Sequence, residues 1–171
     1  DKLSSPDCGV FDITDDGKMA VGSHRGKPAI CHIGDNGNVS WEYLPTPATI
    51  ATPRGHVIAT TPDGSCMVGT VTNNSMDFDG GYQEHPVMWK NGKLVELPNI
   101  PTGRFGYKLS RLIDISADGN VIIGGLHYIY PAEIQHYVYY VNEQKAEIIG
   151  TDQFFSTGST VTTACMSTSG E

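Results

Sequence analysis

The sequence predicts an all-β fold built from repeated four-stranded antiparallel units, for two reasons. The 171-residue chain contains 20 glycines and 10 prolines, and no stretch longer than about ten residues has apolar residues at helical spacing. In addition, a twelve-residue module occurs three times, beginning at Phe11, Ile58 and Ile113. We therefore expect stacked sheets of the β-propeller type rather than a helical solenoid.

Each copy of the module is organised around one turn. A Thr or Ser stands three residues before a glycine, an Asp immediately precedes that glycine, and another glycine follows five residues later. The turn glycines are Gly17, Gly64 and Gly119. Because Gly and Asp tolerate positive φ angles, Asp-Gly between short apolar runs predicts a type I′ hairpin joining the first two strands.

A second hairpin follows the first in each copy. The first copy reads PAICHI, GDNGN and VSWEYLP, and the second reads HPVMW, KNGK and LVELP. Asn-Gly supplies the turn in these two copies, whereas Glu143-Gln144 supplies a weaker version in the third. Each module is thus expected to form four antiparallel strands, and the sheets must pack on one another to bury both faces.

The repeats predict one domain of about three blades, at 10–45, 56–98 and 112–150, with the first strand of a fourth at 163–171. Gly17, Gly64, Gly119 and Gly170 are separated by 47, 55 and 51 residues, the period of a four-stranded blade. Three units and one strand fall short of the usual four to eight blades. The chain is expected to be a fragment, to share a ring with a second copy, or to stay open with an edge that favours self-association.

The stretch from His85 to Pro98 resembles extracellular repeats of the HAF type, which carry His-Ala-Phe before a Trp, an Asn-Gly turn and a closing Leu-Gly. The likeness covers most of Val10 to Gly150, with Cys31 and Tyr140 standing where Trp89 does. This resemblance implies a secreted or surface-attached β-propeller, extracellular or periplasmic, and carries over no catalytic residue. Kelch repeats are the weaker alternative, because their double glycine is matched in a single copy.

Charge and hydropathy exclude two classes of partner. The chain has 19 acidic and 11 basic residues, a formal charge of −8, and no basic run that would follow a phosphate backbone. Its apolar runs are far shorter than the roughly 20 residues that span a bilayer. We expect neither a nucleic-acid partner nor a membrane span. The chain opens at Asp1 without a signal peptide, so we expect the numbering to begin after processing or at a chosen boundary.

Long connections at one end of the sheets predict the binding face. The tight hairpin turns lie at the other end, and propellers carry function on their longer loops. The longest connection runs from Thr70 to Glu84. We expect a glycan or a protein ligand there, held by acidic, aromatic and basic side chains. These are Asp77, Asp79, Tyr82, Arg104, Tyr128 and Tyr130.

Simpler interpretations of the same residues stay open. The tyrosines would also cover blade edges, and arginines such as Arg54 and Arg111 would also form surface ion pairs. Asp77 and Asp79 fit part of a calcium loop, but the twelfth position is Pro86 instead of a bidentate Glu. The histidines and cysteines lack zinc-site spacing, so no metal or cofactor is expected.

Function is expected to be non-catalytic. The sequence has no GxSxG motif and no glycine-rich phosphate loop before a helix. These absences favour a ligand-binding or scaffolding propeller module of an exported protein, and not an enzyme. The alternative is a fragment of a propeller enzyme that acts on polysaccharide, with its catalytic acids in blades outside this chain.

Overall fold

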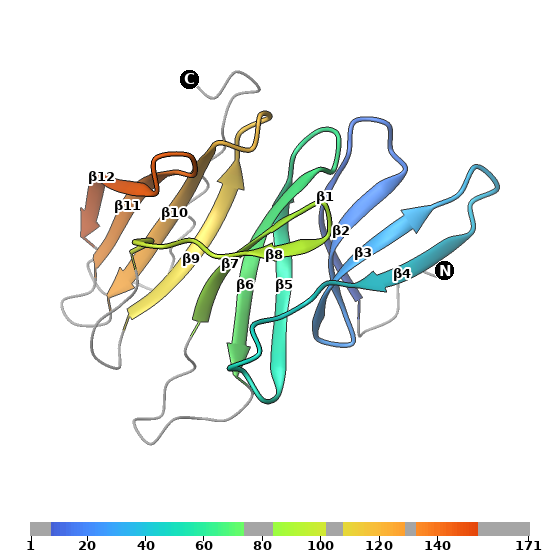
Figure 1. The fold of residues 1–171 in the computed structure, drawn as a ribbon, viewed down its shortest axis with the longest axis horizontal. Coiled ribbons are helices and arrows are strands. Elements are labelled where there is room, and N and C mark those ends of the chain that lie inside the picture. Colours follow the sequence, from blue (N-terminus) through green and yellow to red (C-terminus); the bar gives the residue numbers. More distant parts are fainter. Residues whose placement is uncertain (1–7, 74–83, 102–107, 129–132, 154–171) are drawn as a thin grey trace.

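The computed structural model describes residues 8–73, 84–101, 108–128 and 133–153, and the regular structure within them is entirely β (Figure 1). Three four-stranded antiparallel sheets follow one another along the chain, each with its strands in sequence order. The predicted all-β fold of repeated four-stranded units is confirmed. The division into blades of one domain, with a fourth unit at 163–171, falls partly outside the described residues and stays a prediction.

The strands have the following bounds. The first sheet contains β1 (Cys8–Ile13), β2 (Met19–His24), β3 (Lys27–Ile33) and β4 (Val39–Tyr43). The second contains β5 (Pro53–Thr60), β6 (Cys66–Asn73), β7 (Glu84–Lys90) and β8 (Lys93–Val95). The third contains β9 (Lys108–Ile115), β10 (Val121–Tyr128), β11 (Glu133–Tyr140) and β12 (Lys145–Gln153).

The hydrophobic core lies between the sheets, which stand side by side in Figure 1. One cluster fills the space between the first and second sheets and includes Val21, Val57 and Trp89. The other fills the space between the second and third sheets and includes Val68 and Leu112. The middle sheet therefore contributes apolar side chains to both clusters, as expected of a sheet covered on both faces.

The turn between the first two strands of each sheet differs from the predicted type. In the first sheet the amide of Gly17 donates to the carbonyl of Thr14 at 2.9 Å, and the φ of Gly17 is +67°. Asp16 is not among the described residues with positive φ, although a type I′ turn requires positive φ at both central residues. The type I′ prediction for Asp-Gly is wrong: the glycine closes a longer turn from its fourth position.

A steric constraint explains the second glycine of the module, which follows the turn glycine by five residues. Each first strand carries a bulge, at Phe11 in β1 and at Ile58 in β5, and the strand backbone there comes very close to the opposing strand. A Cβ at Gly22 would lie 1.9 Å from the carbonyl oxygen of Gly9, and one at Gly69 would lie 2.1 Å from that of His56. Only glycine leaves room for the bulged partner.

Aromatic side chains connect successive sheets. The indole of Trp89, fully buried, donates a hydrogen bond of 2.7 Å to the carbonyl oxygen of Pro45. The hydroxyl of Tyr139 likewise donates to the carbonyl oxygen of Pro98 at 2.7 Å. Both prolines follow the last strand of the preceding sheet. Tyr137 and Tyr139 of β11 both lie in the core and are 0% and 1% exposed.

The strands are longer than expected at the loop end, the end of the sheets opposite the Asp-Gly turns. Thr70 pairs with Pro86 and Thr72 with Glu84, so that β6 and β7 extend into the predicted loop. In the third sheet, β10 continues to Tyr128, which pairs with Glu133 of β11. Threonine and histidine fit a pleated ladder as readily as a loop, and cross-strand pairing decides between the two.

Candidate functional site

Most of the predicted ligand-binding residues lie outside the described residues. This applies to Asp77, Asp79, Tyr82, Arg104 and Tyr130. Tyr128 is the last residue of β10, and its backbone pairs with Glu133. The structure does not describe its side chain. The assignment of these six residues to one site stays a prediction.

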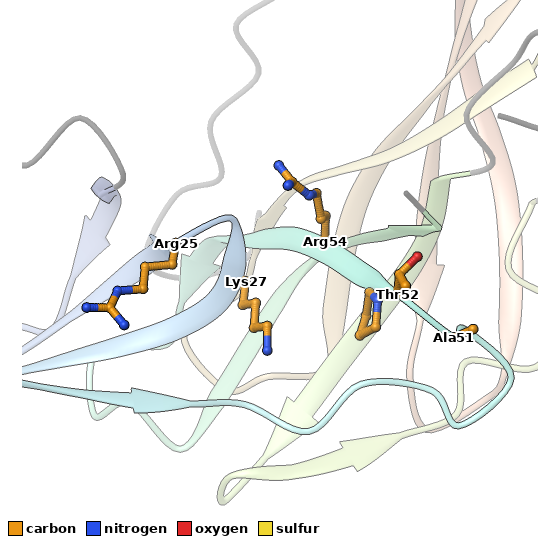
Figure 2. Close-up of a pocket in the computed structure, with 6 residues that line it drawn as sticks. Arg25, Lys27, Ala51, Thr52 and Arg54 are labelled. Atoms are coloured by element: carbon orange, nitrogen blue, oxygen red, sulfur yellow. The ribbon is translucent and has the colours of Figure 1, made fainter. Parts of the chain in front are cut away.

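A hollow of about 350 Å³ lies at the loop end, at the junction of the first two sheets (Figure 2). Two short segments line it: the turn between β2 and β3, and the stretch that leads into β5. The lining residues are Arg25, Lys27, Ala51, Thr52, Pro53 and Arg54.

The turn between β2 and β3 is a two-residue type I′ turn with a cation on either side of Gly26. Arg25 and Gly26 have φ of +51° and +72°, and His24 pairs with Lys27 across them. Positive φ at both central residues is the type I′ signature. Arginine tolerates this geometry poorly, so the residue at this position adopts a strained conformation while its side chain stays exposed.

A backbone hydrogen bond joins this turn to the second sheet. The amide of Gly55 donates to the carbonyl of Gly26 at 3.0 Å. The side chain of Arg54 consequently lies over the turn, with Nη1 3.5 Å from the position that a Cβ of residue 26 would take. This contact brings together residues that are far apart in the sequence.

Arg25, Lys27 and Arg54 give the hollow positive charge on a chain with a net charge of −8. All three are exposed, and none forms a salt bridge with a carboxylate of the described residues. Figure 2 shows the three side chains pointing in different directions. The hollow therefore attracts anions by charge, and it does not hold a preformed set of donors aimed at one atom.

Three rings from β2 and β4 lie beside the hollow. His24 stacks on Trp41 with ring centroids 4.8 Å apart and on Tyr43 at 5.6 Å. The hydroxyl of Tyr43 and Nδ1 of His24 are 2.8 Å apart, and Nζ of Lys27 lies 5.7 Å from the Tyr43 ring centroid. These residues form an aromatic shelf next to the cations. Flat, partly exposed rings of this kind stack on sugars or on peptide side chains.

Arg111, a second arginine considered as an anion ligand, is already paired. Its Nε lies 3.1 Å from Oε2 of Glu84, and its Nη2 lies 3.3 Å from Oε1. His56 is nearby: burial lowers the pKa of His56, Glu84 opposes that shift and Arg111 adds to it. Arg111 therefore serves to join β9 to β7, whereas Arg54 remains available to a ligand.

The cysteines that the structure describes are free thiols. Cys31 and Cys66 are buried free thiols, and Cys8 is a half-buried one. Burial raises the pKa of Cys31, and Cys8 adds to the shift. A raised pKa keeps the thiol protonated and unreactive.

Sequence reasoning missed Arg25 and Lys27. Arg-Gly is an unusual pair for a type I′ turn, where Asn-Gly and Asp-Gly prevail, and neither residue was among the predicted ligand-binding residues. The available signal was the two cations flanking Gly26. Within the described residues, no three His, Cys, Asp or Glu side chains gather as a metal site. The same residues contain no helix long and apolar enough to cross a membrane.

Comparisons with known proteins support a fold but assign the chain to no family. No family model matches the sequence, and no curated protein is significantly similar to it. Among solved structures, the chain is similar to one from a structural and mechanistic analysis of two prolyl endopeptidases, with a TM-score of 0.52 and 16% identity. The similarity covers 82% of this chain and 21% of that chain. This chain thus spans about a fifth of the length of the structure it matches.

The comparison defines the class of protein as all-β of β-propeller type, because the similar structure contains a propeller. Neither the HAF type nor the kelch type is indicated by it. The prediction that the chain is not an enzyme is wrong, because the similar structure belongs to an endopeptidase. A propeller within a hydrolase needs no catalytic motif of its own. The absence of such motifs from this chain is therefore no argument against an enzyme.

Proposed function

We propose that this chain is the propeller portion of a larger hydrolase of the peptidase type, and that its loop end binds an acidic segment of a peptide. The observation that carries the binding proposal is the cluster of Arg25, Lys27 and Arg54 around the hollow, without carboxylate partners among the described residues. The similarity to an endopeptidase structure supports the class of enzyme.

The arrangement suits an extended peptide with carboxylates. The cations lie on two segments at the junction of the first two sheets, and the aromatic shelf of His24, Trp41 and Tyr43 continues from Lys27. Each exposed ion pair contributes at most about 1 kcal/mol. Three of them give about 3 kcal/mol, roughly a hundredfold in affinity, and the effect is strongly screened at an ionic strength near 0.15 M.

Fluorescence polarisation with a labelled Glu-rich peptide tests the proposal. We expect binding that weakens with salt, that is lost with a Gln-for-Glu peptide, and that weakens at least tenfold in the variant Arg25→Ala/Lys27→Ala/Arg54→Ala. The matched control removes three cations elsewhere, Lys18→Ala/Lys93→Ala/Lys145→Ala, and should bind nearly as well as the wild type. Equal losses in the two triple variants would show attraction without a site and contradict the proposal.

A polysaccharide is the second candidate ligand, and the aromatic shelf favours it. His24 and Trp41 stack with only 9° between their ring planes, and such flat surfaces fit sugar rings. The same assay with labelled polygalacturonate separates the two ligands. Polysaccharide binding that Trp41→Ala abolishes, together with no peptide binding, would replace the peptide proposal. An extracellular or periplasmic location stays a prediction of the sequence.

A further inference from the structure

The three sheets meet around one imidazole, that of His56 on β5. Thr70 pairs with His56 on one side and with Pro86 on the other, and Thr72 pairs with Glu84 in the same ladder. Every second residue of a strand points to the same face of a sheet. The side chains of His56 and Glu84 therefore lie on one face of the second sheet, on the two strands that flank β6.

A side chain of the third sheet crosses this face. Strand β9 packs against β5, β6 and β7, and it carries Arg111. Nε of Arg111 donates a hydrogen bond of 3.1 Å to Oε2 of Glu84, and Nη2 donates one of 3.3 Å to Oε1. The side chain of Glu84 is 14% exposed and that of Arg111 is 52% exposed. A largely buried carboxylate is thus bound through both oxygens by a guanidinium group that solvent reaches.

The first sheet contributes an aromatic ring to the same place. The rings of Phe11 in β1 and His56 have centroids 5.1 Å apart, and their planes are inclined by 35°. The half-buried imidazole thus has a neighbour from each sheet: Phe11 from the first, Glu84 from the second and Arg111 from the third. A change in the charge of His56 therefore acts on the junction of all three sheets.

Two groups of opposite charge act on the imidazole. Burial lowers the pKa of His56 below its ordinary value of 6.5, Glu84 opposes that shift and Arg111 adds to it. At neutral pH the imidazole is therefore uncharged, and Glu84 pairs with Arg111. Protonation of His56 places a second cation beside the same carboxylate, so that two cations compete for one anion.

The charged groups of the other neighbouring strands are directed elsewhere. Strand β6 has no acidic or basic residue. The carboxylate of Asp12 in β1 accepts a hydrogen bond of 2.8 Å from an amide of β5. His85 of β7 lies on the opposite face of the second sheet, and Asp114 of β9 lies past the bulge, towards the Asp-Gly turn. Strands β2 and β3 meet β5 through apolar side chains, Val21 and Ile30. The titration of His56 therefore depends on the ion pair beside it.

We propose that His56, Glu84 and Arg111 form an acid-sensitive switch that loosens the junction of the three sheets. At about pH 7 the uncharged imidazole packs against Phe11 while Arg111 binds Glu84. When a proton from solvent binds the imidazole, Glu84 turns to the imidazolium and releases Arg111, and the ion pair between β7 and β9 opens. This inference does not depend on the proposed function.

The switch makes the junction less stable in acid. Because the pKa of His56 is lowered, the folded chain binds this proton less readily than the unfolded chain does. The stability that the neutral imidazole provides is complete above about pH 6.5 and is lost as the pH falls from there through the pKa of the folded state. Arg111 is released over the same interval, so the loss is concentrated where β5, β7 and β9 meet.

Nuclear magnetic resonance of the labelled 171-residue chain between about pH 8 and pH 5 tests the switch. The titration of His56 should have its midpoint below 6.5. The Nε–H signal of Arg111 should move from the shift of a carboxylate-bound guanidinium group towards that of a free one, with the same midpoint. In His56→Gln, and in His56→Phe, which keeps a ring at that position, the signal should stay at the bound shift. The control His32→Gln removes a histidine at the surface of β3 and should behave as the wild type does.

Substitutions in the ion pair should move the titration of His56 in opposite directions. Glu84→Gln removes the anion, so the midpoint should fall. Arg111→Gln removes the competing cation and frees the carboxylate, so the midpoint should rise, whereas Arg111→Lys keeps the charge and should stay closer to the wild type. Circular dichroism at each pH checks that the variants are folded.

Four outcomes would overturn the inference. An Arg111 signal that stays unchanged while His56 titrates would exclude the exchange of partners, and an equal change in His56→Gln would assign it to another group. Midpoints that move in the same direction in Glu84→Gln and Arg111→Gln would indicate altered packing instead of competing charges. Loss of the circular dichroism signal with the same midpoint would replace the local switch by unfolding of the whole chain.

Discussion

The hydroxyl and carboxylate of the repeated turn form a small hydrogen-bonded unit. In the second sheet, Oγ1 of Thr61 donates to Oδ1 of Asp63 at 2.7 Å and accepts from the amide of Cys66 at 3.0 Å. Oδ1 of Asp63 also accepts from the amide of Ser65 at 2.9 Å. The first and third sheets repeat this pattern around Asp16 and Asp118. These aspartates satisfy turn amides, so they are structural residues and not ligands.

Acid sensitivity follows from the same unit. The hydrogen bonds from the Ser65 amide and the Thr61 hydroxyl lower the pKa of Asp63 from 3.8 to about 2. A lowered folded-state pKa stabilises the fold above the unfolded value, and that contribution is lost as the pH falls from about 4 to about 2.

We expect Asp63→Asn to be less stable at neutral pH and to lose less free energy of unfolding than the wild type between pH 4 and 2. The difference should be no more than about 1 kcal/mol, because the carboxylate is exposed and solvent screens it. Urea denaturation at a series of pH values measures it. The same acid loss in both proteins would contradict the role of Asp63, and Asp35→Asn is the control.

The hydroxyl of Tyr139 is expected to stabilise the contact between the second and third sheets. Tyr139→Phe removes the donor to the Pro98 carbonyl without opening a cavity. Loss of one buried hydrogen bond costs about 1 to 2 kcal/mol, and thermal or urea unfolding measures this. Tyr140→Phe, half-buried on the same strand, is the control and should change stability little. Equal effects of the two substitutions would argue against the hydrogen bond.

Among the turns that join third to fourth strands, the third sheet uses an unfavourable residue. Gln144 has φ of +52° at a turn where Gly37 and Gly92 have +74° and +71° in the other sheets. A left-handed conformation costs a non-glycine residue about 1 kcal/mol. Gln144→Gly should therefore raise the free energy of unfolding by about 0.5 to 1 kcal/mol in urea. Glu143→Gly, at a position without positive φ, should lower it instead. A loss of stability in Gln144→Gly would contradict the turn geometry.

A substitution at Gly69 tests the close approach of β5 and β6 at the bulge in the second sheet. A methyl group there would lie 2.1 Å from the carbonyl oxygen of His56, so Gly69→Ala must displace a strand. We expect a loss of about 3 kcal/mol or failure to fold. Gly150→Ala in β12 is the matched control, since its added Cβ would meet nothing within 4 Å. Chemical denaturation compares the two, and a tolerated Gly69→Ala would mean that β5 and β6 are further apart.

The elements could largely be predicted from the sequence, and their junctions could not. Apolar runs around Asp-Gly and Asn-Gly turns are local signals, so the four-stranded units followed from short stretches of chain. The predicted turn type at Asp16 was wrong because the hydroxyl of Thr14 and the carboxylate of Asp16 together favour a longer turn. The hollow was missed because Arg25 and Arg54 meet only through the hydrogen bond between Gly55 and Gly26, a contact between sheets that no local pattern encodes.

At the scale of the whole molecule, the repeat explains how the sheets depend on one another. A four-stranded sheet alone cannot bury two faces, and each interface here combines an apolar cluster with an aromatic donor to a proline carbonyl. Within the described residues, the middle sheet packs against a neighbouring sheet on both faces and each end sheet on one face. The function could not be predicted from the fold of this chain, because a propeller supplies a scaffold that is compatible with many functions.

The face-to-face packing of the sheets can be measured by nuclear Overhauser effects in protein labelled at the methionine methyl groups. The methyl carbon of Met19 lies 2.9 Å from the ideal Cβ position of Gly64 in the next sheet. We expect a strong cross-peak between the Met19 methyl and the α-protons of Gly64, 45 residues later in the chain. A Met19 methyl group whose cross-peaks all arise from the first sheet would contradict the stacking of these sheets.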